Sequence, residues 1–403
     1  MRIEQELQAW SEAFAMRTRG DVGDGIVAVL ALAGAKDLIS FGGGFPDPAT
    51  FPGQALADIL SELIASGDAS AFQYSPTQGL ASVRAYLRER LAALEGLEPS
   101  ESEILVTSGG IEGLELLGKS FLDPGDTVIV EAPTYMGAIM AFRSFEANLV
   151  GVSMDDEGLR PDELEDAAAG TRPKLLYTIP DHQNPAGVSL STERRQALVD
   201  FAQRRGILVV EDVAYRELGF HGDREPSLWS LAPDVVVQIG TFSKTFFPGV
   251  RLGWAAGPAE VIAQITSAKQ LTDQCAGALG QRLLEEYGRR GLLDEQVRRA
   301  CQLYGRRSDL MQAALAEHMP DAISWTKPRG GFFSWLTLPP SLDSLALSPK
   351  AMAERVAYVP GTLFFPDGRG RNTIRLAFSK VEDGDIGEGI QRLGHLLRTQ
   401  LAG

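Results

Sequence analysis

Short apolar segments alternate with helix-like segments over residues 104–257, and this alternation constrains the fold more than any other feature. The intervening segments carry apolar residues three and four positions apart, which is the spacing of a helix. Strands that are continuously apolar have to be covered on both faces. The pattern therefore predicts an α/β fold with a mostly parallel sheet flanked by helices. The predicted strands are ILVTSGG (104–110), TVIVEAP (127–133), KLLYTIP (174–180), ILVVEDVAY (207–215), VVVQIGTF (235–242) and RLGWAAG (251–257).

The remainder of the chain predicts a second, smaller α+β unit. Single hydrophobic cores stop growing at roughly 250–300 residues, and this chain has 403. Residues 258–318 have helical periodicity, and strand-like segments follow Arg329. We expect a large domain over 55–295 and a small C-terminal domain over 296–403, with residues 1–54 forming an N-terminal arm and part of the small domain.

The charge balance argues against nucleic-acid and membrane partners. The net charge is −15, whereas a phosphate backbone or an anionic lipid surface calls for a clustered basic face. The N-terminus lacks the apolar region of a signal peptide, and no apolar run approaches the ~18–20 residues of a membrane span. The two cysteines and four histidines show no metal-site or disulfide spacing. We expect a soluble cytoplasmic protein without a bound metal.

Residues 113–120 (GLELLGKS) match the nucleotide-binding pattern G-x-x-x-x-G-K-[ST]. That motif needs a flexible loop that precedes a helix. Here the middle residues are helix formers with core spacing, and Asp123-Pro124-Gly125 ends the segment soon after the match. We interpret it as an amphipathic helix packed on the sheet.

Lys244 lies between two hydroxyl residues in the segment GTFSKTFFPGVR, and Arg251 follows it. A lysine can form a Schiff base because its pKa falls readily when it is desolvated or placed beside another cation. Thr241, Ser243 and Arg251 could hold an anion beside it. This arrangement suits a pyridine-aldehyde cofactor that carries a phosphate.

Four further candidates lie at or just after the ends of predicted strands, at the edge where open α/β sheets bind ligands. Asp212 could keep the ring nitrogen of such a cofactor protonated, which makes the ring an electron sink. Tyr215 and Asn184 could bind the phenolate oxygen, and Tyr135 could stack on the ring. Each residue also has an ordinary interpretation, as a turn or a rim residue of the sheet. Their occurrence together, in this order, favours a cofactor site.

The segment Ser108-Gly109-Gly110-Ile111 lies where a predicted strand passes into a helix. Exposed N–H groups and the helix dipole make such a place an anion site. The alternative is an ordinary glycine-rich turn.

Taken together, these motifs resemble the fold-type I pyridoxal 5'-phosphate (PLP) aminotransferases of class I/II. The resemblance is closest to the branch of α-aminoadipate (LysN-type) and kynurenine aminotransferases, and the aminotransferase-like domains of MocR regulators are also similar. It extends over nearly the whole chain. The segments that carry it are SFGGGFPDPATFP, QYSPTQG, EAPTY, QNPAG, EDVAY, GTFSKTFFPGVRLGW, GGFFSW and IRLAFS.

The resemblance implies a role for each candidate. Lys244 would form the Schiff base with PLP, Asp212 would bind the ring nitrogen, and Tyr215 would bind the phenolate oxygen. The other residues implied in cofactor binding are Gly109, Gly110, Ile111, Tyr135, Asn184, Thr241, Ser243, Arg251 and Tyr74, the last reaching across a homodimer. Arg375 would bind the substrate α-carboxylate through its bidentate fork, with Asn184, Gly43 and Gly44 beside the substrate.

Two regions depart from the family pattern. The family usually has Gly-Ser-Gln where this chain has Gly109-Gly110-Ile111, so phosphate binding there would depend on backbone N–H groups. The N-terminal segment retains Arg17 and Arg19 but lacks the usual Ile-Arg pair, which affects the expected side-chain specificity.

The resemblance implies transfer of an amino group between an L-amino acid of aminoadipate, aromatic or branched-chain type and a 2-oxo acid such as 2-oxoglutarate. A PLP-dependent β- or γ-lyase is the alternative on the same fold. A ligand-sensing regulatory domain is a second alternative.

Overall fold

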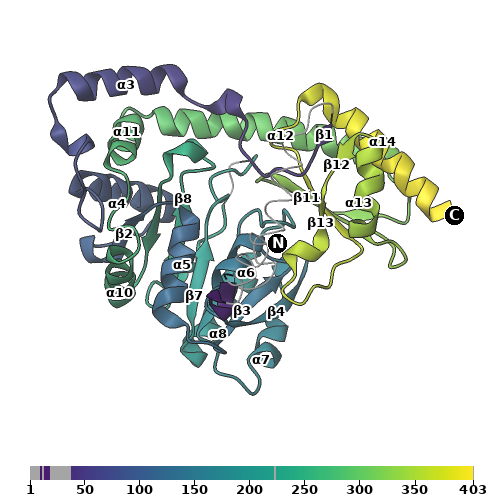
Figure 1. The fold of residues 1–403 in the computed structure, drawn as a ribbon, viewed down its shortest axis with the longest axis horizontal. Helices are drawn as coiled ribbons and strands as arrows, with labels where there is room; N and C mark the ends of the chain where they lie inside the picture. The colour runs from purple at the N-terminus through teal and green to yellow at the C-terminus, as the bar shows by residue number, and fades with distance from the viewer. Residues whose placement is uncertain (1–9, 11–12, 19–37, 222–223, 403) are drawn as a thin grey trace.

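The computed structural model describes residues 10, 13–18, 38–221 and 224–402 (Figure 1). An eight-stranded sheet occupies the larger part of the molecule, and a four-stranded sheet lies in the smaller part. Among the described helices, none is long and apolar enough to cross a membrane.

The large sheet is mixed but mostly parallel. Its strands are β2 (Ile104–Thr107), β3 (Thr127–Ala132), β4 (Asn148–Asp155), β5 (Gly158–Leu159), β6 (Leu175–Thr178), β7 (Leu208–Asp212), β8 (Val236–Thr241) and β9 (Gly253–Ala256). They lie in the order β2-β9-β8-β7-β6-β3-β4-β5. The pairs from β4 through β3, β6 and β7 to β8 are parallel, whereas β9 is antiparallel to both neighbours and β5 is antiparallel to β4. The predicted fold class is therefore confirmed.

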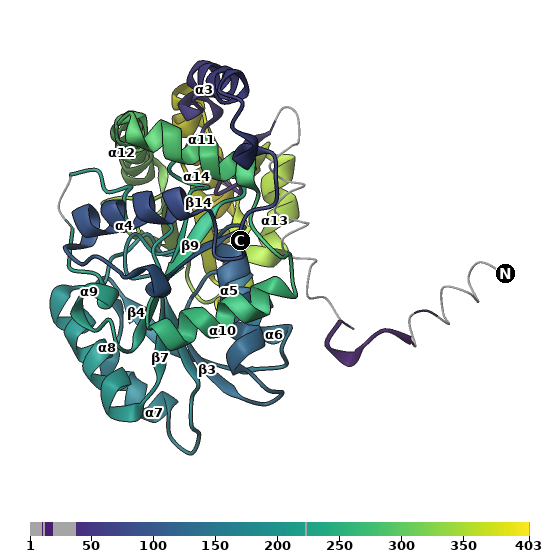
Figure 2. The same cartoon turned by 90° about the vertical axis from the view of Figure 1, so that its left-hand side faces the viewer.

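Helices cover both faces of this sheet, as the continuously apolar strands require. In Figure 2, α8 (Thr192–Arg205) and α9 (Leu228–Leu231) lie on one side of the strands. On the other side lie α5 (Gly110–Phe121), α6 (Met136–Arg143) and α10 (Ala259–Gln270). The remaining helices of this part are α3 (Gly53–Ala65), α4 (Ala81–Glu95), α7 (Leu164–Ala167) and α11 (Ala278–Arg289).

The small sheet has the order β10-β11-β14-β13 and is antiparallel throughout. The 27-residue helix α12 (Leu292–His318) runs from the large part to the small one and packs there against α14 (Asp383–Ala402) (Figure 1). The short strand β1 (Ile39–Ser40) pairs in parallel with β12 (Val356–Ala357), which joins the early chain to the C-terminal part. The predicted domain limits stay a prediction. The other segments here are β10 (Ser324–Trp325), β11 (Phe333–Thr337), α13 (Ser344–Ala353), β13 (Val359–Pro360) and β14 (Thr373–Ala377).

The nucleotide-loop match at residues 113–120 lies inside α5, as the sequence interpretation required. Leu114, Leu116 and Leu117 are buried against the core. The segment is thus an amphipathic helix, and its backbone N–H groups serve the helix rather than a phosphate.

The segments without a counterpart in the sequence prediction include β4, α6 and α13. Helix α13 contains Pro349, a residue that ordinarily disfavours a helix interior. Strand β4 is only partly buried and lacks the continuous apolar run that marked its neighbours.

Candidate active site

A cavity of about 310 Å³ lies beyond the carboxyl ends of β6, β7 and β8. This is the edge at which open α/β sheets bind ligands. Most of the predicted site residues line it together, although they come from distant parts of the sequence. Those residues are Gly44, Gly110, Ile111, Tyr135, Asn184, Asp212, Tyr215, Thr241, Ser243, Lys244, Arg251 and Arg375.

Lys244 lies in this cavity just after β8. Its Nζ donates a hydrogen bond to the carbonyl oxygen of Gly44 over 3.1 Å and lies 5.8 Å from the ring centre of Phe332. Burial, aided by the positive charge of Arg375, lowers the pKa of Lys244 to about 8. The amine is therefore neutral far more often than an exposed lysine amine at the same pH, as a nucleophile or a base requires.

Asp212 ends β7 and is buried in the cavity wall. Its carboxylate accepts hydrogen bonds from the Tyr177 hydroxyl over 2.8 Å and from the Ala214 N–H over 3.0 Å. Burial raises the pKa of Asp212, while these two donors and the nearby Lys244 oppose that rise. The acid is thus held in one orientation and can pair with a cationic group in the cavity.

Arg375 reaches the cavity from β14 of the small sheet. Its Nη1 donates to Oδ1 of Asn184 over 3.0 Å, and its Nη2 donates to the carbonyl oxygen of Gly42 over 2.7 Å. The guanidinium stacks 4.5 Å from the ring centre of Phe333. Its Nε has no hydrogen-bond partner among the described residues. A buried cation with a free donor is suited to an anionic ligand.

The end of the cavity near α5 carries a group of hydrogen-bond donors. The Thr241 hydroxyl lies 3.1 Å from Oγ of Ser243, and Nη1 of Arg251 lies 3.5 Å from the same oxygen. Gly109 precedes α5 with φ of 104°, and a Cβ there would lie 2.9 Å from Nη2 of Arg251. The positive φ favours glycine at this position, and a Cβ there would displace the end of the Arg251 side chain.

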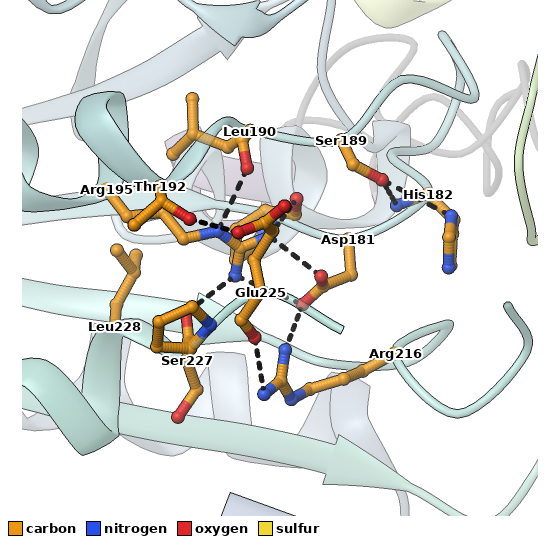
Figure 3. Close-up of polar contacts among 12 residues, drawn as sticks. Asp181, His182, Ser189, Leu190, Thr192, Arg195, Arg216, Glu225, Ser227 and Leu228 are labelled. Carbon is orange, nitrogen blue, oxygen red and sulfur yellow. Dashed lines mark hydrogen bonds and ion pairs between the residues drawn. The ribbon is translucent and has the colours of Figure 1, made fainter. Parts of the chain in front are cut away.

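An ion-pair network supports the turn that carries Asn184 (Figure 3). Asp181 is buried between two arginines and accepts from Nη2 of Arg195 over 2.7 Å and from Nη1 of Arg216 over 2.9 Å. Arg195 also donates to the carbonyl oxygens of Leu190 and Pro180. The network therefore ties both sides of the turn to helix α8.

This network was not predicted from the sequence, because each of its members has the sequence context of an ordinary surface residue. Arg195 belongs to an arginine-rich helix whose sequence is typical of a solvated surface, yet its side chain is fully buried. Glu131 also went unnoticed at the end of β3, where it accepts from Nε2 of Gln183 over 2.7 Å. Burial raises the pKa of Glu131 to about 7. A carboxylate inside an apolar strand was the one signal that could have marked it.

Some predicted residues lie outside the cavity wall. Gly109 and Gly43 adjoin lining residues without lining the cavity themselves. Tyr74 is 77% exposed in this single chain. Arg17 is exposed, and Arg19 lies outside the described residues.

Comparison with known proteins identifies the family of the chain. Residues 36–393 match the family model described as aminotransferase class I and II. The chain is 37% identical to aromatic-amino-acid aminotransferase 1 of Thermococcus litoralis, over 99% of this chain and 98% of the relative.

Two solved structures are similar over nearly their whole length. One is the kynurenine aminotransferase of Pyrococcus horikoshii in complex with PMP, KYN and KYA, with a TM-score of 0.94 and 37% identity over 98% of this chain and 99% of that one. The other is the α-aminoadipate aminotransferase LysN of Thermus thermophilus, complexed with N-(5'-phosphopyridoxyl)-L-leucine. Its TM-score is 0.90, with 38% identity over 98% of this chain and 99% of that one.

Proposed function

Because the chain belongs to the class I and II aminotransferases, a PLP-dependent family that acts on amino acids and 2-oxo acids, we propose a specific division of roles among its cavity residues. Lys244 anchors PLP through Nζ, Asp212 pairs with the ring nitrogen, and Arg375 binds the substrate α-carboxylate. The convergence of these three side chains from β8, β7 and β14 in one cavity carries the proposal.

The residues present fit PLP at each end of the cavity. The hydroxyls of Thr241 and Ser243, the guanidinium of Arg251 and the N-terminus of α5 offer donors to a phosphate. Tyr135, a half-buried side chain of the cavity wall, offers a ring face. Tyr215, whose hydroxyl pKa is raised by burial, stays protonated and can donate to an anionic oxygen. Bound PLP supplies an electron sink for the bonds at the substrate Cα.

Lys244 is the group that moves the proton. With a pKa lowered to about 8, roughly a tenth of its amine is neutral at about pH 7, far more than for an exposed lysine, and this neutral form can accept a proton from the substrate Cα. Arg375 orients that substrate, because its guanidinium is fixed by Asn184, Gly42 and Phe333 before any ligand arrives. A fixed clamp of this kind reduces the entropy that must be lost on binding.

For the amino donor we propose an aromatic amino acid, with aminoadipate or branched-chain donors next and 2-oxoglutarate as acceptor. The cavity wall includes the apolar side chains of Phe45, Leu114, Met136, Ile179 and Phe333, which suit an apolar substrate side chain. The names of the T. litoralis and P. horikoshii relatives support the aromatic class. A panel of amino donors, each assayed with 2-oxoglutarate, tests this order.

We also propose a cytoplasmic homodimer in which Tyr74 reaches the phosphate site of the partner subunit. Tyr74 and Phe72 are 77% and 61% exposed, unusually high for aromatic side chains. The two cysteines are unpaired thiols, which fits a reducing compartment. Sedimentation of the purified chain, alone and as Tyr74→Asp, tests the dimer.

Lys244→Ala tests the central assignment. The variant should retain its fold, lose transamination and lose the covalently bound cofactor, which denaturing mass spectrometry after borohydride reduction detects. Undiminished transamination in the variant would contradict the role of Lys244. Release of ammonia from a single amino acid, without formation of the amino form of the cofactor, would favour the lyase alternative.

A further inference from the structure

Lys269 of α10 is fully buried, which is uncommon for a lysine. Its Nζ donates to both carboxylate oxygens of Glu112, over 2.9 and 2.8 Å, and to both of Asp273, each over 2.7 Å. A buried ammonium is stable only when it is paired in this way. The three side chains form one charge cluster with two carboxylates and one ammonium.

This cluster holds Ser108, the residue that begins the turn before α5. The Ser108 N–H donates to Oε2 of Glu112 over 2.6 Å, and its hydroxyl donates to Oδ2 of Asp273 over 2.6 Å. Its carbonyl oxygen accepts from Nη2 of Arg251 over 3.4 Å. All three polar groups of Ser108 are therefore engaged, and its hydroxyl is directed to the cluster.

The turn itself has few side-chain donors for an anion. Gly110 and Ile111 line the cavity, and neither side chain can donate a hydrogen bond. The first N–H groups of a helix have no partner within the helix. An anion at this turn has to be held by these N–H groups, whose direction depends on how Ser108 is fixed.

The positive charge of Lys269 also affects the turn before α5. Glu112 lies in the first turn of α5, where its carboxylate competes with a phosphate for the positive end of the helix dipole. Lys269 draws Glu112 and Asp273 together and offsets one of their two negative charges. Without the ammonium, two uncompensated carboxylates would adjoin the anion site.

We propose that Lys269 is a positioning residue for the cofactor phosphate: through Glu112 and Asp273 it fixes Ser108, and so sets the direction and the charge of the N–H groups at the start of α5. The inference rests on the proposed function, which assigns the phosphate to this turn. Lys269 itself is not among the residues that line the cavity.

Two forms of the cofactor provide the test, since pyridoxal lacks the phosphate of PLP. Affinities of the full-length, cofactor-stripped chain for each form are measured from the visible absorbance of the bound cofactor. We expect Lys269→Met to weaken PLP binding about tenfold or more, a typical effect of losing a partner that supports a ligating group. Its affinity for pyridoxal should stay nearly unchanged. The matched control is Lys119→Met, because Lys119 also bonds this region, at Oγ1 of Thr272, but from the exposed surface.

Two further variants keep the proposal testable if Lys269→Met folds poorly. Ser108→Ala removes only the bond to Asp273 and should weaken PLP binding about fivefold, the value of one net hydrogen bond. Adding Glu112→Gln to Lys269→Met supplies an amide that can donate to Asp273 and accept from Ser108, so it should recover part of the lost PLP affinity.

The outcomes separate this inference from the proposed function. Arg251→Met should also weaken PLP selectively over pyridoxal. If it does not, the phosphate assignment itself is wrong. If Arg251→Met is selective but Lys269→Met and Ser108→Ala weaken both forms equally, or neither form, the positioning role of Lys269 is wrong.

Discussion

Nη1 of Arg375 donates a hydrogen bond to Oδ1 of Asn184 over 3.0 Å, although the two residues are 191 positions apart. This bond joins β14 of the small sheet to the turn after β6 of the large sheet. The cavity is therefore closed by a direct contact between the two parts of the molecule. Replacing either residue would leave a buried polar group of the other without this partner.

Replacement of Arg375 by lysine should impair substrate binding far more than folding. Lysine retains the positive charge but cannot form the bidentate fork to a carboxylate. We expect kcat/KM to fall by at least about thirtyfold, corresponding to ~2 kcal/mol for a buried charged contact. Steady-state assays with an aromatic donor provide the measurement. Arg371→Lys is the control, because that side chain is 75% exposed and pairs with Asp343 at the surface; an equal loss in both variants would contradict the assignment.

The amine of Lys244 should titrate well below the range of an ordinary lysine. In the cofactor-free chain, labelling of Lys244 by an acylating reagent should rise with pH, with a midpoint near the lowered pKa of about 8. Because Arg375 contributes to that lowered pKa, Arg375→Gln should move the midpoint upward. Peptide mass spectrometry measures the labelling, with the exposed Lys380 as the reference for reagent decay. A midpoint unmoved by the substitution would argue against the coupling.

The same titration makes a prediction for stability. The folded chain releases the Lys244 proton at about pH 8, whereas the unfolded chain retains it up to the ordinary value of 10.5. The unfolded state therefore binds more protons between these values, and the contribution of Lys244 to the free energy of unfolding increases with pH across that window. Between about pH 7.5 and about pH 10, the free energy of urea unfolding should shift toward the folded state more in the parent chain than in Lys244→Met.

Tyr177→Phe should shift the acid side of the pH–rate profile. The Tyr177 hydroxyl donates to Asp212, and burial already raises the pKa of that acid. Loss of the donor raises it further, so activity should fall first at low pH while the plateau changes little. Asp212→Asn should lower the rate at every pH, by about 10²-fold or more. Tyr358→Phe removes a buried hydroxyl that donates to Ser344 outside the cavity, and its acid limb should coincide with that of the parent.

Arg195→Met should destabilise the chain by about 3 kcal/mol or more, because it leaves Asp181 in a buried pair with only Arg216. Arg205→Met on the same helix breaks an exposed pair with Glu165 and should cost about 0–1 kcal/mol. Denaturant unfolding near neutral pH measures both free energies.

The same ion pair makes a prediction for acid pH. Burial alone would raise the pKa of Asp181, but the two arginines hold it well below the ordinary 3.8. The stability that this pair contributes is present above pH 3.8 and is lost as the pH falls below it. Below pH 3.8, the difference in the free energy of unfolding between Arg195→Met and the parent chain should therefore become smaller.

The location of the candidate site could be predicted from the sequence, because the order of parallel strands fixes which residues lie at their carboxyl ends. Asp212 and Thr241 end apolar strands and Asn184 follows one, and the carboxyl ends of parallel strands meet at one edge of the sheet. Lys244 and Arg251 are close in the chain to one of these ends. Apolar periodicity also sufficed to recognise α5 as a helix at residues 113–120.

What the sequence by itself determined is therefore the mostly parallel sheet, the polar residues at the ends of its strands and the candidate lysine beside them, since these depend on short-range patterns. Only the tertiary structure decided which charges are buried and with what partners. Arg195 and Lys269 resemble surface charges in the sequence, and each becomes a buried, paired group through contacts with residues distant in the chain. A charge can be buried only where partners from several segments converge, and that convergence is a property of the folded chain alone.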